Sequence, residues 1–276
     1  MDYIIYHKEE IIIAAIVLVV LYLLFYILRS KKRRLKLAFY INFILYKLGL
    51  KKRMSKKNIG MVRLIESYEP LVELVRHPKI IINSSTIEEP VMLRKKVALR
   101  LCKIADKLPD GMYIKLYSAY RSRIKLYEIW KAELEKMERE NPNLGRAELL
   151  MQLKRKVTSP DGSMGGHDTG AALDLALCDA NGKELDFGTK YHDKHAESVT
   201  LTEEQKNNQK YILKLMKSQD FVQYPGQWWH YSYGDRYWAA YKGKRLGAFY
   251  GSAEKEFENS GYVAIIKKQS SSLNVK

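Results

Sequence analysis

The chain begins with one long apolar run and continues with shorter stretches of alternating or periodic hydrophobic residues. Residues 11–28 are all apolar or aromatic and carry no charge. At about 1.5 Å per residue, a helix of this length spans roughly 27 Å, close to the hydrocarbon core of a bilayer. We therefore predict a transmembrane helix at 11–28. A cleaved signal peptide is the alternative; it is disfavoured because the preceding residues are acidic and no small-residue cleavage site follows.

The distribution of charge predicts how this helix is oriented. The formal net charge is +17, yet residues 1–10 carry a net charge of −2, whereas residues 29–57 hold twelve basic residues and no acidic one. Basic flanks remain cytoplasmic, so we expect 1–10 to be an extracytoplasmic tail and the remainder to lie in the cytoplasm. A basic segment beside an apolar run favours binding to anionic lipid rather than to nucleic acid.

A second apolar stretch, residues 35–50, leaves this orientation open. Lys36 and Lys47 bracket only ten uncharged residues, about half of what a spanning helix needs. We predict an amphipathic helix that lies in the membrane interface and completes a basic juxtamembrane segment, residues 29–57. If residues 35–50 crossed the bilayer instead, the C-terminal part of the chain would face outwards.

The remaining pattern predicts one α+β domain at residues 58–251, followed by a tail at 252–276. With 46% hydrophobic residues, the chain can bury one sizeable core. Helical periodicity or capping signals are found at 90–108, 123–140, 146–157 and 203–218, strand signals at 80–82, 113–117 and 174–177, and a helix or extended arm is expected at 61–77. We expect an antiparallel sheet with helices packed on it. The two cysteines, Cys102 and Cys178, give no disulfide framework.

Two short stretches within this domain contain the residue types that bind metals. They are Gly166-His167-Asp168-Thr169-Gly170-Ala171-Ala172-Leu173-Asp174 and Gly226-Gln227-Trp228-Trp229-His230-Tyr231. Two imidazoles and one carboxylate are a typical ligand set for a catalytic zinc, which keeps its fourth position open. Spacing alone leaves the alternative of a capped turn and a core histidine.

These stretches, together with Ser118-Ala119-Tyr120-Arg121-Ser122 and Gly234-Asp235-Arg236-Tyr237-Trp238-Ala239, resemble the VanX-type D-alanyl-D-alanine dipeptidases. Those are zinc enzymes whose fold is shared with D-Ala metallopeptidases and hedgehog signalling domains, and the resemblance covers roughly residues 90–251. It implies a Zn²⁺ cofactor on the sheet, bound by His167, Asp174 and His230. It also implies that Arg121 stabilises the developing oxyanion. The expected substrate contacts are Tyr120, Asp168 and Trp229.

Three residues depart from the family pattern: Ser118 stands where the family usually has an acidic residue, Gly165 where it commonly has a serine, and Gln227 at the position of the general base. The family has a glutamate three residues before the final histidine, where it acts as general base, and this chain has Gln227. A carboxamide cannot take up a proton at neutral pH, and loss of a general base typically reduces the rate by ~10²–10⁴-fold. Asp168, His192 and His195 are the alternative bases, although solvated side chains are the simpler explanation for the two histidines.

Three hypotheses of function follow from the sequence. The resemblance implies a membrane-anchored metallopeptidase that hydrolyses D,D-dipeptides or the D-Ala-D-Ala ends of peptidoglycan stems. Gln227 favours a second hypothesis, a catalytically inactive pseudoenzyme that binds zinc and D-Ala-terminated ligands as a sensor or scaffold. The third is a lipid-surface adaptor whose metal site is only structural.

Overall fold

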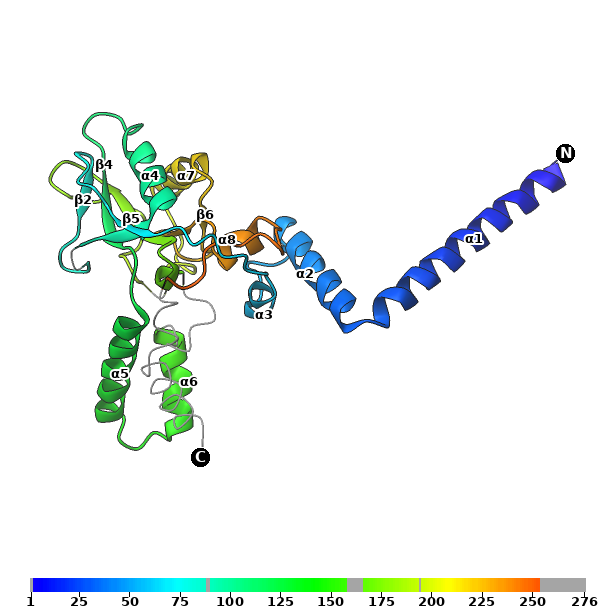
Figure 1. Ribbon diagram of the computed structural model, residues 1–276, viewed down its shortest axis with the longest axis horizontal. Coiled ribbons are helices and arrows are strands. Elements are labelled where there is room, and N and C mark those ends of the chain that lie inside the picture. Colours follow the sequence, from blue (N-terminus) through cyan, green and yellow to red (C-terminus); the bar gives the residue numbers. More distant parts are fainter. Residues whose placement is uncertain (1, 88–89, 158–165, 194, 254–276) are drawn as a thin grey trace. The chain divides into compact units, whose positions relative to one another are not determined.

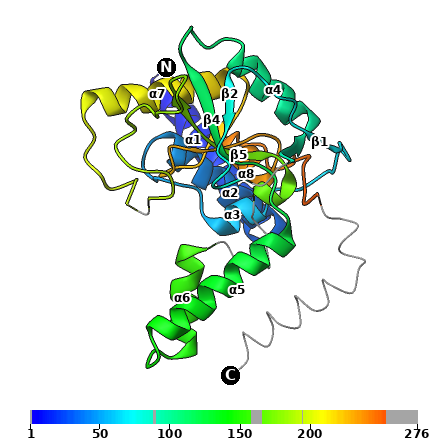
Figure 2. The ribbon, with the colours of Figure 1, turned by 90° about the vertical axis from the view of Figure 1, so that its left-hand side faces the viewer.

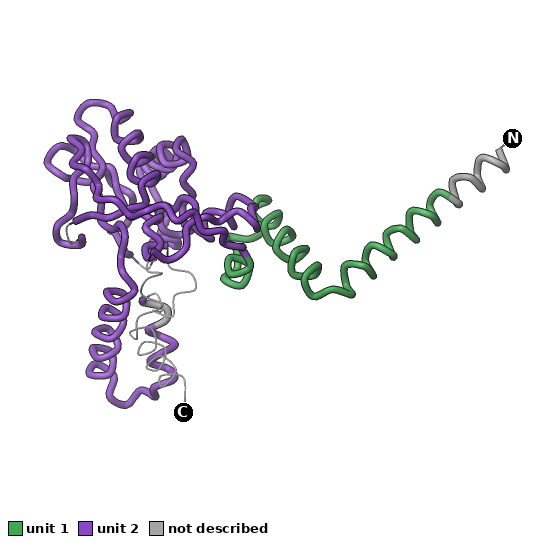
Figure 3. The backbone as a smooth tube through the Cα atoms, viewed as in Figure 1, with its two compact units in different colours: residues 1–61 green, residues 62–276 purple. Residues whose placement is uncertain are grey.

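The protein is described here by a computed structural model. It describes the backbone of residues 2–87, 90–157, 166–193 and 195–253; the side chains of 2–11 and 154–156 are outside the description. The chain forms two compact units, residues 1–61 and residues 62–276 (Figure 3). Most of the C-terminal tail predicted at 252–276 therefore lies outside the described residues.

The first unit contains three helices. They are α1 (Asp2–Leu28), α2 (Lys31–Lys47) and α3 (Lys56–Gly60). Basic side chains at the start of α2 bind the last carbonyl groups of α1: Arg33 donates to the Tyr26 carbonyl and Arg34 to the Leu28 carbonyl, each at 2.7 Å. These bonds satisfy acceptors that have no partner within α1 itself.

Among the residues whose side chains are described, no single helix combines the length and the hydropathy needed to cross a bilayer. The helices at 12–28 and 31–47, whose axes meet at 108°, have the required length and hydropathy only when they are taken together. The span at 11–28 therefore stays a prediction.

The second unit is built on a five-stranded sheet with the strand order β2-β4-β5-β7-β6 (Figure 1). Its strands are β2 (Ile80–Ile82), β4 (Tyr113–Ser118), β5 (Ala172–Cys178), β7 (His230–Ser232) and β6 (Val222–Gln223). The pairs β4–β5, β5–β7 and β6–β7 are antiparallel, as predicted, whereas β2 pairs with β4 in parallel. The sheet is thus mixed. All seven residues of β5, the central strand, are buried, so this strand lies within the hydrophobic core.

The predicted helix at 90–108 is wrong at its beginning. Residues Met92–Arg94 form β3, which pairs antiparallel with β1 (Leu71–Glu73), and the helix α4 covers only Lys95–Ala105. Helical spacing extends through this stretch, but pairing with a strand from the preceding arm overrides it. The arm expected at 61–77 is accordingly extended around β1.

The helices that cover the sheet contribute amphipathic faces. The buried residues of α4 recur at helical spacing: Val97, Ala98, Leu101, Ile104 and Ala105. Helix α7 (Glu203–Ser218) contacts α4 and lies on the same side of the sheet (Figure 1). Thr202 and Gln205 form a capping box at its start, as the sequence indicates. Asp235 caps the N-terminus of helix α8 (Arg236–Tyr241), because its carboxylate accepts the Trp238 N–H at 2.7 Å.

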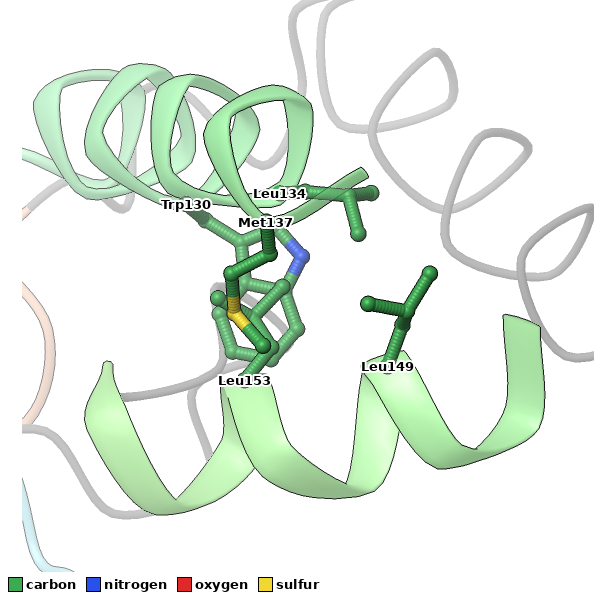
Figure 4. Packing of buried hydrophobic residues seen from close by; sticks show 5 residues of the cluster. All are labelled: Trp130, Leu134, Met137, Leu149 and Leu153. Atoms are coloured by element: carbon green, nitrogen blue, oxygen red, sulfur yellow. The ribbon is translucent and has the colours of Figure 1, made fainter. Parts of the chain in front are cut away.

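Helices α5 (Arg123–Glu140) and α6 (Arg146–Lys156) form a hairpin that projects from the sheet (Figures 1 and 2). The hairpin has a hydrophobic core of its own, made by Trp130, Leu134, Met137, Leu149 and Leu153 (Figure 4). Ser122 caps α5 by accepting the Lys125 N–H at 3.1 Å. Because these contacts are local along the chain, both helices agree closely with the sequence prediction.

One buried arginine of β3, Arg94, joins three segments that are far apart in the sequence. Arg94 is 5% exposed, and its guanidinium donates to the carbonyl groups of Glu69, Thr169 and Gly251. It also lies 3.6 Å from the buried carboxylate of Glu66. Arg94 thereby connects the extended arm and the end of the described chain to the turn that precedes β5.

We expect Arg94→Met to lower the free energy of unfolding by about 3–5 kcal/mol, because it leaves the Glu66 carboxylate buried without its cation. Urea denaturation followed by tryptophan fluorescence measures this, since all four tryptophans lie in residues 62–276. Lys96→Met is the matched control: its ion pair with Glu69, at 3.5 Å, involves an exposed lysine and is worth about 0–1 kcal/mol. Equal losses in the two variants would contradict the role of Arg94.

Candidate metal centre

Three side chains of metal-binding type meet on the sheet. Asp174 lies within β5, and His230, the first residue of β7, is its direct register partner. His167 belongs to a short 3-10 turn, η1 (His167–Thr169), which leads into β5. One possible ligand atom from each residue lies within 4.8 Å of the other two. The fold thus brings together the three residues for which the resemblance implies zinc binding.

Hydrogen bonds orient the two imidazole rings. His167 Nδ1 lies 2.8 Å from the Ala119 carbonyl oxygen, so this nitrogen donates and Nε2 faces Asp174 Oδ2 at 3.3 Å. His230 presents Nδ1 to Asp174 Oδ1 at 2.8 Å. Bonds from the far nitrogen of a histidine to a carbonyl group commonly fix the ring orientation at metal sites.

The protonation states of these groups fit a metal ion. Burial lowers the pKa of His167 despite the facing Asp174 carboxylate, and the charge of Arg121 acts in the same direction. Burial alone would raise the pKa of Asp174, but His167, His192 and His230 outweigh it and hold this pKa well below its ordinary value. Neutral imidazole and ionised carboxylate are the forms that bind Zn²⁺. The donor set therefore fits zinc.

An aromatic residue that the sequence analysis did not single out completes the surroundings of Asp174. The Tyr191 hydroxyl donates to Asp174 Oδ2 at 3.0 Å, and its ring stacks on Tyr117 at a centroid distance of 4.2 Å. Burial and the nearby Asp174 raise the pKa of Tyr191, so the hydroxyl remains a donor. Tyrosine is common in sequences, and only the path of the loop after β5 brings this one to the site.

Arg121 lines a pocket of about 290 Å³ that adjoins the cluster through Tyr191 and His192, both of which contact Asp174. The pocket also contains Tyr120, Lys125, Tyr191 and His192. The Arg121 backbone N–H donates to the His167 carbonyl at 3.2 Å, which joins the end of β4 to η1. A ligand in this pocket would meet a cation and aromatic rings, as a peptide carboxylate and carbonyl require.

Gln227 and Trp229 flank the last metal-binding residue on its N-terminal side. Gln227 is half-buried in the turn between β6 and β7, and its carbonyl oxygen accepts the His230 N–H at 3.4 Å. Trp229 is buried, and its ring meets Tyr191 edge-on at 5.8 Å. Its carbonyl oxygen accepts the Leu175 N–H at 3.0 Å. The Trp229 ring also lies against the rings of Trp228 and His192, so it packs among the aromatic residues around the cluster.

Asp168 and Tyr120 differ in how accessible they are to a ligand. Asp168 is 5% exposed, and its carboxylate forms an ion pair with Arg123 at 3.3 Å. Tyr120 is half-buried in the wall of the pocket, and its backbone N–H donates to the Met92 carbonyl at 3.1 Å. Of the two, Tyr120 is the residue that a ligand can reach directly.

A glycine allows the metal-binding segments to approach closely. A Cβ atom on Gly166 would lie 2.8 Å from the Ala172 Cβ, 3.2 Å from Asp235 Oδ2 and 3.6 Å from His230 Nε2. We expect Gly166→Ala to lower zinc affinity by roughly 10–100-fold, as changes around metal ligands typically do. Chelator competition measures the dissociation constant. Gly145→Ala is the control, because a Cβ there meets no atom within 4 Å; unchanged affinity in Gly166→Ala would contradict the proposed crowding.

Comparison with known proteins finds a matching family model and a curated relative. The model of the D-Ala-D-Ala dipeptidase family, peptidase M15, matches residues 88–245. A curated relative, a D-alanyl-D-alanine dipeptidase of Synechocystis sp., is 33% identical in an alignment of 88 residues that covers 26% of this chain. The match covers 36% of the relative, so this chain spans about a third of its length.

Two solved structures are similar at low identity. One is a variant of the vancomycin-resistance D,D-pentapeptidase VanY from a VanB-type cassette with Zn(II): 16% identity, 66% of this chain, 92% of that chain, TM-score 0.39. The other is VanYB with D-alanine-D-alanine: 15% identity, 72% of this chain, 97% of that chain, TM-score 0.35. The family match covers more than half of the sequence and includes all three metal-binding residues. This chain belongs to the D-Ala-D-Ala dipeptidase family of metallopeptidases.

Proposed function

We propose that this protein is a zinc-dependent peptidase that hydrolyses D,D-dipeptides or D-Ala-D-Ala ends of peptidoglycan stems. The observation that carries this proposal is the cluster of His167, Asp174 and His230 within a chain of this family. Zinc bound by these residues would polarise the scissile carbonyl and activate water.

The surrounding residues would bind and orient the substrate. Arg121 lines the pocket beside the cluster and would bind the carbonyl oxygen as negative charge develops there. Tyr191 holds Asp174 through its hydroxyl, so the carboxylate keeps its orientation toward the two histidines. Gln227 can donate and accept hydrogen bonds but takes up no proton. We therefore expect slow turnover in the protein as it stands.

Hydrolysis of D-Ala-D-Ala by the zinc-loaded full-length protein tests this function. We expect release of free D-alanine that is slow, is lost when zinc is removed by a chelator and returns when zinc is added. L-Ala-L-Ala is the stereochemical control and should not be cleaved. Release that is insensitive to the metal, or equal rates on the two dipeptides, would contradict the proposal.

The second candidate function is a binder of zinc and D-Ala-terminated ligands that does not turn them over. Gln227 favours this candidate, because it stands where the family has its general-base glutamate and cannot take up a proton. The two candidates share the metal site and the pocket, and they differ only in proton transfer. Turnover by the Gln227→Glu variant separates the two candidates, because only an otherwise intact catalytic site would gain activity from a restored base.

We also propose that residues 11–28 anchor the chain in the membrane, with residues 29–57 on anionic lipid and the metal centre in the cytoplasm. The support is the charge asymmetry and the exposure of every large apolar side chain described from Ile12 to Leu28 except that of Ile27, which is half-exposed. A reporter fused after Lys276 should behave as cytoplasmic in intact cells. Protease access to the domain from outside would instead make residues 35–50 a second span.

A further inference from the structure

A third imidazole lies at the rim of the metal centre. His192 Nε2 is 3.8 Å from Asp174 Oδ2, the oxygen that also faces His167. The side chain of His192 is 58% exposed, so it is accessible from solvent as well as from the cluster. It also lines the pocket that contains Arg121. A ligand that enters this pocket therefore meets His192 beside the cluster.

The loop holds His192 there at a conformational cost. Its backbone φ is +64°, a region that residues other than glycine seldom adopt and that is commonly found at functional sites. The imidazole stacks on the Tyr191 ring at a centroid distance of 4.0 Å. Tyr191 in turn is fixed by its bond to Asp174 and by stacking on Tyr117. The ring is thus held beside the cluster by its stacking on Tyr191, which is itself fixed in place.

Of the three imidazole nitrogens that face Asp174, that of His167 lies at the spacing expected around a shared zinc ion, that of His230 lies closer, and that of His192 lies slightly farther away. Ligand atoms at 2.0–2.2 Å from a tetrahedral zinc lie roughly 3.3–3.6 Å apart. Asp174 oxygens lie 2.8 Å from His230 Nδ1, 3.3 Å from His167 Nε2 and 3.8 Å from His192 Nε2. His195, on the same loop, is exposed, and its backbone N–H donates to Asp193 Oδ1 at 2.8 Å. The possible metal ligands grouped within the described part of the chain are His167, Asp174 and His230; His192 is outside this group but contacts it through Asp174, whereas the structure records no such contact for the described His195.

We propose that His192 is the fourth protein ligand of the zinc site in the substrate-free protein. A small movement of the exposed ring would bring Nε2 from the rim to the coordination position that His167, Asp174 and His230 leave open. A substrate in the adjoining pocket must then displace His192 before it is cleaved. This inference rests on the metal site of the proposed function and adds a resting state to it.

The test uses the full-length protein, the variant His192→Asn and the control His195→Asn. Asparagine tolerates positive φ, so the loop conformation can be retained without the imidazole. X-ray absorption at the zinc edge should count three imidazoles in the unmodified protein and in His195→Asn, and two in His192→Asn. Zinc affinity of His192→Asn should fall by about tenfold or more, the loss typical even of residues outside the ligand set.

Chemical modification gives an independent, residue-resolved measurement. Diethylpyrocarbonate should modify His192 in the metal-free protein, and zinc should protect it, whereas His195 should react in both forms. Two imidazoles in the unmodified protein, with unprotected His192 and unchanged affinity in His192→Asn, would overturn this inference and leave the proposed function intact. Absence of zinc binding to the unmodified protein would overturn both.

Discussion

Gln227→Glu is expected to raise turnover of D-Ala-D-Ala by roughly 10²-fold or more. The substitution restores a carboxylate three residues before His230, where it can accept a proton from the attacking water, and a positioned general base is typically worth ~10²–10⁴-fold. Steady-state release of D-alanine by the zinc-loaded protein measures the change. Zinc content and dipeptide affinity should hardly change, since the metal-binding residues and Arg121 are untouched.

The structure makes this substitution a conservative one. Gln227 is half-buried in a turn, and its backbone carbonyl is bonded to the His230 N–H. Glutamate has the same length, so this turn can be retained. Asp168 is a poor substitute base because its buried carboxylate is already paired with Arg123. His192 also lines the pocket, but as a proposed zinc ligand it would not be free to act as a base.

A matched control for this experiment is Gln219→Glu, the same chemical change at the C-terminal end of α7. It should leave turnover unaltered. High activity in the unmodified protein would show that another group is the base, and His192 would be the first to replace. An inactive Gln227→Glu protein with full zinc occupancy would favour the binder over the enzyme.

His230→Ala is expected to remove most of the zinc from the purified protein. The imidazole contributes one of three ligands, and its Nδ1 lies 2.8 Å from the Asp174 carboxylate. Without it, His167 and Asp174 remain of the three clustered residues, and even with His192 as a further ligand the site has lost the imidazole that lies nearest to the carboxylate. Atomic absorption after dialysis gives zinc per chain, which we expect to fall from about one to a small fraction.

His77→Ala is the control for His230→Ala. His77 is also paired with an aspartate, since its Nε2 lies 3.0 Å from Asp106 Oδ1, but this pair is outside the metal centre. Zinc occupancy should be unchanged in this variant. If His230→Ala kept full zinc occupancy and a native circular dichroism spectrum, the three-residue site would be excluded.

Some features were predictable from the sequence because their causes are local. Helices α5, α6 and α7 agree with the prediction because apolar periodicity and capping residues such as Ser122 and Thr202 act over a few neighbouring positions. The Asn-Gly turn after β5 is predictable for the same reason, and the Asp179 N–H donates to the Lys183 carbonyl across it. The metal-binding residue types, and the family resemblance around them, were equally visible in the sequence.

Other features depend on pairing between distant segments. The first residues of the predicted helix at 90–108 form the strand β3 instead, because they pair with β1 in the preceding arm. β2 joins the sheet in parallel for a similar reason, since a short β-branched run does not specify the direction of its neighbour. An irregularity between Leu116 and Ser118 shifts the register of β4 against β5, and it places Ser118 opposite Asp174. Such choices are decided by which strands meet, and local sequence preference carries little information about them.

The metal centre depends both on the local sequence and on the packing of distant segments. The sequence alone determined which imidazoles and carboxylate were available, and it singled out Gln227 as a departure from the family. Only the tertiary structure decided that Asp174 faces His230 across two strands, that Tyr191 holds the carboxylate and that His192 reaches the rim while His195 does not. The physical reason is that short-range preferences fix helices and turns, whereas the approach of side chains from separate strands and loops depends on how the whole core packs.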